Sequence, residues 1–377
     1  MSKPHFIKLD MRLTCSQKDL FNALTITNKA VDLNNTLPVL NNVLLKAEGK
    51  RLHFTATNLE IAINYWIETD IKNEGEITIP SKLFTNYINY LKDEKIDISV
   101  EEGNSMVIKT SDSTTKIKGI SSNEFPPIPT IEKEGGMIIK VKDFKKGIHQ
   151  VVFAATLNTT RPILAGVYFS VEKDKLKMVA TDSYRLAEKI VTLKKTSGDI
   201  SCIIPAKTIL ELGYILDSLK DSDEIDIVIS KNQVLFTIGA VKIISRLIEG
   251  QFPNYQQIIP KSTKTKIEFD INELTLVLKR INLFAKENNN KIILKANDGQ
   301  VIVTTETTQY GEGEVTIKAK IDGENNEIAL NSQFLLDVLG NIGGEGVVVE
   351  IGEKITPIII RPKEKNDYTH IIMPLKI

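Results

Sequence analysis

Residues 38–43 read Pro-Val-Leu-Asn-Asn-Val, and residues 162–167 read Pro-Ile-Leu-Ala-Gly-Val, so three identical residues recur with the same spacing 124 positions apart. The identity continues at the same offset for three further residues: Leu52, Ala56 and Thr57 recur as Leu176, Ala180 and Thr181. One more period places Thr305 where Thr57 and Thr181 stand. Six matches in one register indicate a duplicated structural unit, and Thr305 indicates a fainter third copy. We therefore predict a scaffold of three similar domains rather than a set of three catalysts.

The chain length and charge agree with this scaffold. A chain of 377 residues divides into three repeats, each long enough to bury a core of its own. We predict domains over 1–130, 137–260 and 264–377, joined by short segments that carry proline. Lys and Arg together number 48, as do Asp and Glu, so the net charge is zero. This argues against a general basic coat for nucleic acid but allows a local basic face.

Cysteine usage and the terminal sequence indicate the compartment. Cys15 and Cys202 lie far apart, and we favour free thiols in a reducing cytosol over the disulfide that they could also form. The N-terminal residues lack a signal-type apolar run, and no stretch approaches the ~20 apolar residues of a membrane span. We expect a cytoplasmic protein that does not contact a membrane.

Each repeat shows the same order of predicted elements: an amphipathic helix, a hairpin, a strand leading into a second helix, and two closing strands. The first helices are expected over 16–31, 142–156 and 271–286, with Ser16 as an N-cap. The hairpins are expected over 39–57, 167–180 and 292–305, and the second helices begin near residues 81, 206 and 332. Two helices backing antiparallel strands in each repeat predict an α+β fold.

Signals for catalysis or for metal binding are weak. None of the four histidines, His5, His53, His149 and His370, is paired at metal-ligand spacing, and neither a Walker A run nor a Gly-x-Ser-x-Gly motif is present. We expect no metal and no cofactor. Two alternatives to a non-catalytic scaffold remain open: a ligand-binding or structural repeat protein, and an enzyme with an unrecognised hydrolytic site.

Three motifs carry a family resemblance. They are Ala-Thr-Asp-x-x-Arg-Leu-Ala at 180–187, Gly-x-Phe-Pro-x-Tyr at 250–255, and Met-Pro-x-Lys-Ile at 373–377. In this order, and over the whole chain, the sequence resembles the bacterial DNA polymerase III beta subunits, the DNA sliding clamps. The resemblance implies three tandem clamp domains that form half of a closed ring around duplex DNA. It implies a processivity factor of DNA polymerase III that catalyses nothing itself.

The resemblance also implies the partners and a docking pocket. The partners would be double-stranded DNA bound without sequence preference, the polymerase III alpha subunit, the clamp loader complex, other replication and repair proteins with a clamp motif, and a second copy of the chain. The pocket would lie between domains two and three and receive short peptides. By motif match its residues are Leu164, Thr181, Tyr184, Arg185, Leu186, Pro253, Ile258, Ile371, Met373, Pro374 and Leu375.

Two further surfaces follow from the same resemblance. Helices lining the ring would face DNA, together with the loops that contain Asn34 and, further along, Asn158 and Arg161. The DNA-facing lysines would be Lys18, Lys145, Lys146 and Lys207. The dimer interface would join Leu283 and Phe284 of domain three to an edge strand of domain one that contains Ile117. Glu306 and Glu312 could add charge complementarity to Lys116 and Lys118.

Overall fold

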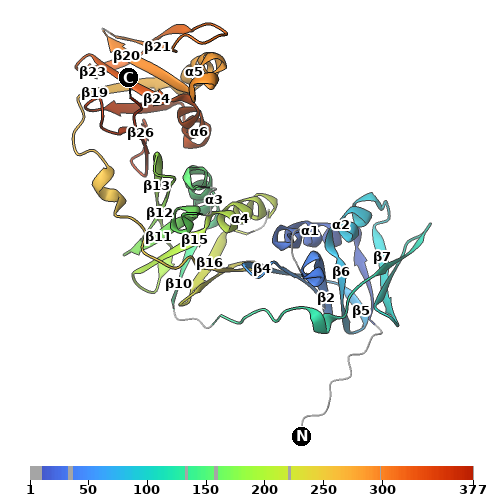
Figure 1. Cartoon of the computed structure of the whole chain (residues 1–377). Coiled ribbons are helices and arrows are strands. Elements are labelled where there is room, and N and C mark those ends of the chain that lie inside the picture. The colour runs from blue at the N-terminus through green and yellow to red at the C-terminus, as the bar shows by residue number, and fades with distance from the viewer. Residues whose placement is uncertain are drawn as a thin grey trace. The chain divides into compact units, whose positions relative to one another are not determined.

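The computed structural model describes residues 11–32, 37–131, 135–156, 160–219, 222–297 and 299–376 (Figure 1). The described chain is α+β, as the sequence predicted. It divides into two compact units: Met1–Ile138 with Tyr214–Leu247, and Ile139–Gly213 with Ile248–Ile377. We call them unit 1 and unit 2 and describe each by itself.

The described α-helices come as two in each repeat. They are α1 (Gln17–Thr27), α2 (Ser81–Tyr90), α3 (Val141–Val151), α4 (Ala206–Ser218), α5 (Ile271–Ala285) and α6 (Ser332–Ile342). Short 3₁₀ turns continue the first helix of each repeat, at Asn28–Ala30, Val152–Ala154 and Lys286–Asn288. The first helices are therefore shorter than predicted, because their apolar spacing runs on into these tighter turns.

Unit 1 contains two antiparallel runs of strands. One sheet has the order β5-β1-β7-β8-β9, and the other contains the run β16-β17-β18-β4-β3-β2-β6. The strands of the first sheet are β1 (Arg12–Ser16), β5 (Asp70–Asn73), β7 (Lys95–Glu101), β8 (Ser105–Lys109) and β9 (Thr114–Lys118). Those of the second run are β2 (Asn42–Glu48), β3 (Arg51–Thr57), β4 (Ile61–Glu68), β6 (Gly75–Pro80), β16 (Glu224–Ile229), β17 (Gln233–Ile238) and β18 (Val241–Arg246).

The core of unit 1 is formed by the paired helices and both groups of strands. The helices α1 and α2 lie side by side over the strands (Figure 1). The Ser16 hydroxyl caps α1 by accepting a hydrogen bond from the Asp19 backbone N–H, as predicted. Leu20 and Leu24 of α1 and Phe84 of α2 are buried in one cluster with residues of both sheets. This burial of the apolar helix faces fixes the helices on the strands.

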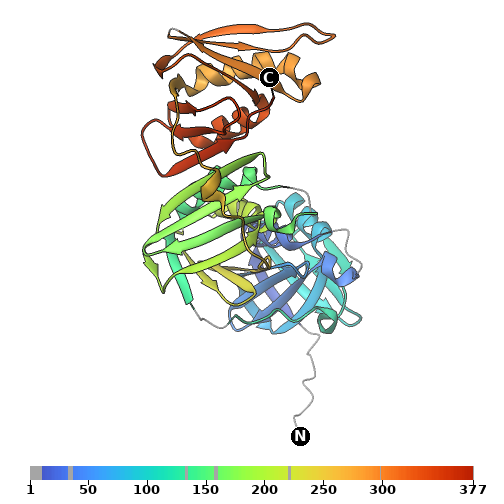
Figure 2. The same cartoon turned by 60° about the vertical axis from the view of Figure 1, so that its left-hand side comes forward.

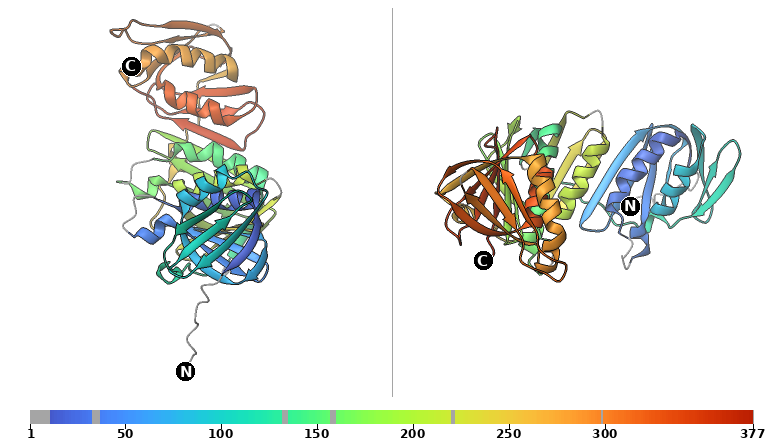
Figure 3. Two further views of the ribbon diagram at one scale, coloured as in Figure 1. Left: turned by 90° about the vertical axis from the view of Figure 1, so that its right-hand side faces the viewer. Right: turned by 90° about the horizontal axis from the view of Figure 1, so that it is seen from above.

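Unit 2 contains a nine-stranded sheet and a four-stranded sheet (Figure 2). The large sheet has the order β15-β11-β12-β13-β27-β26-β25-β19-β23. Its strands are β11 (Gly166–Glu172), β12 (Lys175–Thr181), β13 (Arg185–Thr192), β15 (Ile200–Pro205), β19 (Thr265–Asp270), β23 (Lys320–Gly323), β25 (Gly346–Ile351), β26 (Ile358–Pro362) and β27 (Tyr368–Ile372). The small sheet has the order β22-β21-β20-β24, formed by β20 (Lys291–Asn297), β21 (Gln300–Thr304), β22 (Glu314–Lys318) and β24 (Asn326–Asn331). The helices α5 and α6 lie side by side in this unit (Figure 3).

One strand pairing joins each pair of successive repeats. In unit 1, β18 of repeat two pairs antiparallel with β4 of repeat one, with Ile243 opposite Ile63. In unit 2, β27 of repeat three pairs with β13 of repeat two in the same way, with Ile371 opposite Leu186. The repeats are therefore linked by continuous sheets and not only by the proline-bearing segments.

Several strands were not predicted. Each repeat has a strand before its first helix, namely β1, β10 (Gly135–Lys140) and β19, and β14 (Lys195–Thr196) is a further short one. The strands β4 and β13 follow the predicted hairpins directly. Arg185, from the motif at 180–187, is the first residue of β13 and pairs with Ile372.

Candidate functional site

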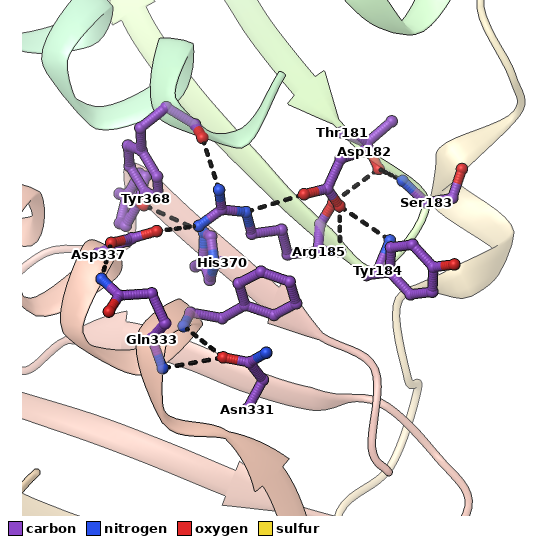
Figure 4. Close-up of polar contacts among 12 residues, drawn as sticks. Thr181, Asp182, Ser183, Tyr184, Arg185, Asn331, Gln333, Asp337, Tyr368 and His370 are labelled. Atoms are coloured by element: carbon purple, nitrogen blue, oxygen red, sulfur yellow. Dashed lines mark hydrogen bonds and ion pairs between the residues drawn. The ribbon is translucent and has the colours of Figure 1, made fainter. Parts of the chain in front are cut away.

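The turn that connects β12 to β13 is held by its own side chains (Figure 4). The Thr181 hydroxyl donates to the Arg185 carbonyl at 2.6 Å and accepts from the Ser183 N–H at 3.2 Å. The Asp182 carboxylate accepts from the N–H groups of Tyr184 at 2.9 Å and Arg185 at 3.0 Å. Ser183 has a φ of +79°, which closes the turn. These local bonds replace ladder hydrogen bonds and make the turn rigid.

The guanidinium of Arg185 connects repeat two to repeat three. Its Nε donates to Asp182 at 3.1 Å, its Nη1 to Asp337 of α6 at 2.5 Å, and its Nη2 to the Phe153 carbonyl at 2.9 Å. The group also lies over the Phe334 ring, 4.5 Å from its centroid. The Arg185 side chain is only 11% exposed. It therefore acts as a joint between repeats two and three.

A buried histidine lies beside this joint. The His370 ring is stacked on Phe153 at a centroid distance of 5.5 Å, and its Nδ1 is 3.4 Å from the Tyr368 hydroxyl (Figure 4). Burial, with a smaller effect of the Arg185 charge, lowers the pKa of His370 to about 3. Its Nε2 has no hydrogen-bond partner among the described residues. The ring is therefore neutral at physiological pH and keeps charge out of the interior.

The C-terminal segment is attached to the turn by backbone hydrogen bonds. The Met373 N–H donates to the Tyr184 carbonyl at 2.8 Å, and the Leu375 N–H donates to Ala329 at the same distance. Tyr184 is 65% exposed, and Met373 and Ile258 are partly exposed. The expected pocket residues Leu164, Thr181, Leu186 and Ile371 are buried, Pro253 is exposed, and Pro374 and Leu375 are half-buried. Among the predicted residues we call the exposed Tyr184, Ile258 and Met373 the rim.

The Phe-Pro segment is fixed to the same layer by aromatic contacts. Phe252 is stacked on Tyr168 at 4.9 Å, and the Tyr255 hydroxyl donates to Glu188 of β13 at 2.5 Å. Phe252 and Tyr255 belong to one buried cluster with Leu186 and Ile371. The structure therefore brings together the three motifs that the sequence comparison singled out.

The expected DNA-facing residues are surface residues of separate elements. Lys18 lies on α1, Lys145 and Lys146 on α3, and Lys207 on α4; Lys145 is half-buried and the others are exposed. Arg161 is exposed and donates to the Ser183 hydroxyl at 3.3 Å. Asn34 and Asn158 lie outside the described residues. Lys18 belongs to unit 1 and the other three lysines to unit 2.

The residues expected at a dimer interface differ in their exposure. Leu283 is 69% exposed on α5, whereas Phe284 is half-buried near Gly313. Ile117 is only 6% exposed and packs in the core of unit 1, so β9 offers its backbone edge and not this side chain. Both β9 and β22 are edge strands of their sheets.

Three of the four charged side chains expected to face each other at that interface, Lys116, Glu306 and Glu312, have partners within the chain. Lys116 pairs with Glu101 at 2.6 Å. Glu306 pairs with Lys291 at 2.5 Å and contacts Asn288, and Glu312 accepts from Thr307. Any pairing across an interface would have to compete with these contacts.

Comparison with known proteins decides the family. Three models of the DNA polymerase III beta subunit match in order: the N-terminal domain at residues 11–129, the central domain at 138–254 and the C-terminal domain at 256–376. The chain belongs to the DNA polymerase III beta subunit family. The resemblance seen in the sequence is thereby confirmed. Members of this family are DNA sliding clamps, which act as processivity factors.

Relatives of the chain cover nearly all of it. The beta sliding clamp of Synechocystis is 29% identical over 389 residues, covering 97% of this chain and 100% of that one. The solved sliding clamp of Bacillus subtilis is 28% identical with a TM-score of 0.93, covering 98% of this chain and 100% of that one. A Pseudomonas aeruginosa clamp bound to griselimycin is 27% identical with the same TM-score, covering 98% and 100%.

Three further observations concern membrane spans, metal clusters and the cysteines. The described residues contain no helix long and apolar enough to cross a membrane, and no cluster of His, Cys, Asp and Glu that could hold a metal ion. Cys15 and Cys202 are both free, which confirms the prediction of unpaired thiols. Burial raises the pKa of each thiol to about 12, so both are protonated and unreactive at neutral pH.

Sequence reasoning missed the residues that hold the joint. Asp337, Phe334 and Glu188 carry no motif, and only their three-dimensional contacts with Arg185 and Tyr255 reveal them. Asp337 is 152 positions from Arg185, and a helix face with one acidic residue gives no signal of such a contact.

Proposed function

We propose that two copies of this chain close head to tail into a ring around duplex DNA and keep the replicative polymerase on its template. The observation that carries this proposal is the ordered match of all three beta-subunit domains along the chain. We assign the three domains to residues 1–130, 137–260 and 264–377. We also propose that the protein acts in the cytoplasm. In this proposal the ring itself catalyses nothing.

In this proposal the helices hold DNA without reading it. The exposed lysines Lys18, Lys146 and Lys207 lie on three different helices, α1, α3 and α4. Arg161 is also exposed and lies beside the hairpin of repeat two. Phosphate contacts carry no sequence information and weaken with salt, which suits a protein that must slide. The topological link, and not affinity, keeps the ring on DNA.

The dimer would form between the edge of β9 and the edge of β22. Unpaired strand edges present free N–H and C=O groups, and pairing the two edges would remove both from solvent. Leu283, exposed on α5, and Phe284 would cover the junction. Ile117 would contribute its backbone only.

Partners would dock by short peptides on the rim described above. Tyr184, Ile258 and Met373 would surround an apolar segment, with Leu164, Leu186 and Ile371 beneath it. Partly exposed Met373 can adjust its shape to different side chains. The polymerase III alpha subunit, the clamp loader and other clamp-motif proteins would share this surface and therefore compete for it.

Retention on DNA of different topology tests the ring. The purified chain is assembled on a nicked circular duplex with a clamp loader and separated from free protein by gel filtration. We expect retention that is lost when the duplex is linearised, because a ring slides off free ends. Equal retention on both forms would refute encirclement and favour a surface-binding repeat protein.

Mass in solution tests the dimer on its own. Light scattering at micromolar concentration should report twice the chain mass. A purely monomeric sample would contradict the closed ring.

A further inference from the structure

Unit 1 contains a cavity of about 100 Å³ that the proposed function does not use. It is lined by Thr57, by residues 59–62 of the turn after β3 and the start of β4, and by the proline-rich segment 126–129. Gln233 of β17 and Ile244 and Arg246 of β18 complete the lining. Every lining residue belongs to unit 1.

The turn beside this cavity has the same hydrogen-bond frame as the turn 181–185 in unit 2. The Thr57 hydroxyl donates to the Ile61 carbonyl at 2.9 Å and accepts from the Leu59 N–H at 3.0 Å. The Asn58 side chain accepts from the N–H groups of Glu60 at 3.0 Å and Ile61 at 2.9 Å. Leu59 has a φ of +74°, close to the +79° of Ser183. The repeat with a period of 124 residues therefore includes the conformation of this turn.

The strand that completes the site is copied as well. Ser245 of β18 lies opposite Ile61, as Ile372 of β27 lies opposite Arg185. The Arg246 N–H donates to the Glu60 carbonyl at 3.0 Å, as the Met373 N–H donates to Tyr184 at 2.8 Å. The cavity thus occupies, within unit 1, the place that the proposed peptide surface occupies within unit 2.

Among the residues that differ between the two copies, two change the chemistry of the site most. Ile61 stands in place of Arg185, so no guanidinium links two repeats at this position. The first residue of β4 is instead apolar and buried. Arg246 stands in place of Met373, and its exposed guanidinium has no hydrogen-bond or ion-pair partner among the described residues. Leu59 forms an exposed lip at 46%. The copy therefore combines a small cavity of mixed lining, in which aliphatic and proline side chains lie beside polar ones, with an unpaired cation at its edge.

We propose that this cavity is a second docking site for an extended peptide, which inserts one aliphatic side chain and places a following carboxylate on Arg246. The volume suits a single side chain, since it equals that of about three water molecules. Peptide pockets of full size are roughly 300 Å³ or more, so this site binds weakly and serves as a second anchor for a partner already held elsewhere. The second site would add a contact for the partners of the proposed function, and its biological use rests on that function. Glu60 also lines this cavity, and its negative charge would repel the carboxylate of the peptide. A variant that removes this charge therefore provides a matched test.

Methyl NMR of the full chain tests the site with a defined probe. The chain is labelled at isoleucine δ1 methyls and titrated with acetyl-Gly-Leu-Asp-Gly-amide, and with the same peptide carrying Asn in place of Asp. We expect the methyls of Ile128 and Ile244 to shift, with a Kd on the order of 1 mM for the Asp peptide. The Asn peptide should bind at least fivefold more weakly.

Variants assign the contacts. Arg246→Ala should weaken the Asp peptide at least fivefold and leave the Asn peptide within twofold, whereas Glu60→Gln should strengthen the Asp peptide. Lys242→Ala removes the same charge from an exposed position on the same strand outside the lining, and should change neither affinity. Ala62→Leu fills the cavity and should abolish both titrations, while unchanged methyl positions in unit 2 show that the variant is folded.

The same spectra separate this inference from the proposed function. Ile258 and Ile371 report the surface in unit 2. Shifts there without shifts at Ile128 and Ile244 up to 10 mM peptide would overturn the second site and leave the proposed function intact. Equal effects of Arg246→Ala and Lys242→Ala would also overturn it. Shifts at Ile128 and Ile244 that respond to Arg246→Ala support the site even if the chain proves monomeric, because the readout does not require ring closure.

Discussion

All three nitrogens of the Arg185 guanidinium donate hydrogen bonds to groups within the chain. Two of the contacts are carboxylates, Asp182 and Asp337, and both are at least partly buried. Removal of the guanidinium leaves these carboxylates close together without a cation, which is more costly than losing a surface ion pair. The side chain that the family motif marks is therefore first a structural requirement.

Arg185→Ala should lower the free energy of unfolding by about 3 kcal/mol, because it leaves two carboxylates uncompensated. Arg185→Lys should recover only part of this, since an ammonium cannot bond Asp182, Asp337 and the Phe153 carbonyl in one plane. Urea unfolding followed by circular dichroism measures both. Arg246→Ala, at an exposed arginine, should change stability by less than about 0.5 kcal/mol, and a similar loss in both variants would refute the special role of Arg185.

The buried His370 should make the free energy of unfolding depend on pH. Its folded-state pKa of about 3 lies below the ordinary value of 6.5. Between these values the unfolded chain binds a proton that the folded chain does not, so this residue contributes stability that is lost as the pH falls below 6.5. The loss is about 1.4 kcal/mol per pH unit at most. His370→Phe should flatten the pH dependence of unfolding between pH 6 and 4, and an unchanged slope would contradict the assignment.

At the scale of single residues, the motif match assigned Tyr184, Ile258 and Met373 to the peptide surface, and each of the three is exposed. The contacts of Arg185 with Asp337 and Phe334 had no such signal in the sequence. Ile117 was expected at an interface, yet its side chain fills the core. An isolated aliphatic residue on an edge strand can face either side of the sheet, and only the register decides which.

Among the elements, α5 and the edges of β9 and β22 carry the proposed dimer. Leu283→Ala combined with Phe284→Ala should weaken dimerisation by removing apolar surface from the junction. Sedimentation velocity at several concentrations should show a shift toward the monomer. Ile355→Ala removes an equally apolar side chain that is highly exposed in a loop, and should leave the profile unchanged. An unaltered profile for the double variant would refute the placement of the interface.

The C-terminal segment is a second element with a defined role. Deletion of residues 373–377 removes the Met373 and Leu375 side chains together with the backbone bonds that hold them to the turn and to Ala329. We expect loss of binding to a polymerase-derived peptide in fluorescence anisotropy, with the dimer intact in sedimentation. Met373→Leu, which conserves volume, should keep the affinity within a few-fold. Full affinity after the deletion would count against the site.

Periodicity predicted the helices and hairpins well, because each has one buried face and a clear turn. It missed β4 and β13, which follow a hairpin directly. In β4 the run Ile-Ala-Ile at 61–63 is buried throughout, so the alternation typical of a half-exposed strand is absent. The strands β1, β10 and β19 were missed because each leads straight into the first helix of its repeat, and the helical pattern dominated the sequence there.

For the molecule as a whole, the repeat predicted three similar parts but not the strand pairings that join them. The pairing of β4 with β18 links residues about 180 positions apart, and no local pattern encodes such a partner. The duplicated turn frames at 57–61 and 181–185 explain why the pairing recurs: both turns start a strand whose edge accepts the last strand of the next repeat.

The salt response should separate encirclement from adhesion. Once assembled on circular DNA, the chain should keep its residence time within about twofold between 50 and 200 mM salt, whereas phosphate-dependent binding loses orders of magnitude over that range. Lys145→Ala with Lys146→Ala should slow assembly and leave residence unchanged. Gel filtration of the complex at each salt concentration measures both, and a steep fall in residence would point to surface binding.

The edges β9 and β22 belong to different sheets, so in the proposed dimer each chain would pair one edge with an unlike edge of its partner. Such a heterologous contact has no built-in limit, and a third chain could add to the second as readily as the second to the first. In the proposed ring, only the rotation from one chain to the next would stop the growth at two. A change at a joint such as Arg185 that opens this angle would convert a finite particle into a linear polymer, visible as fibres in the electron microscope.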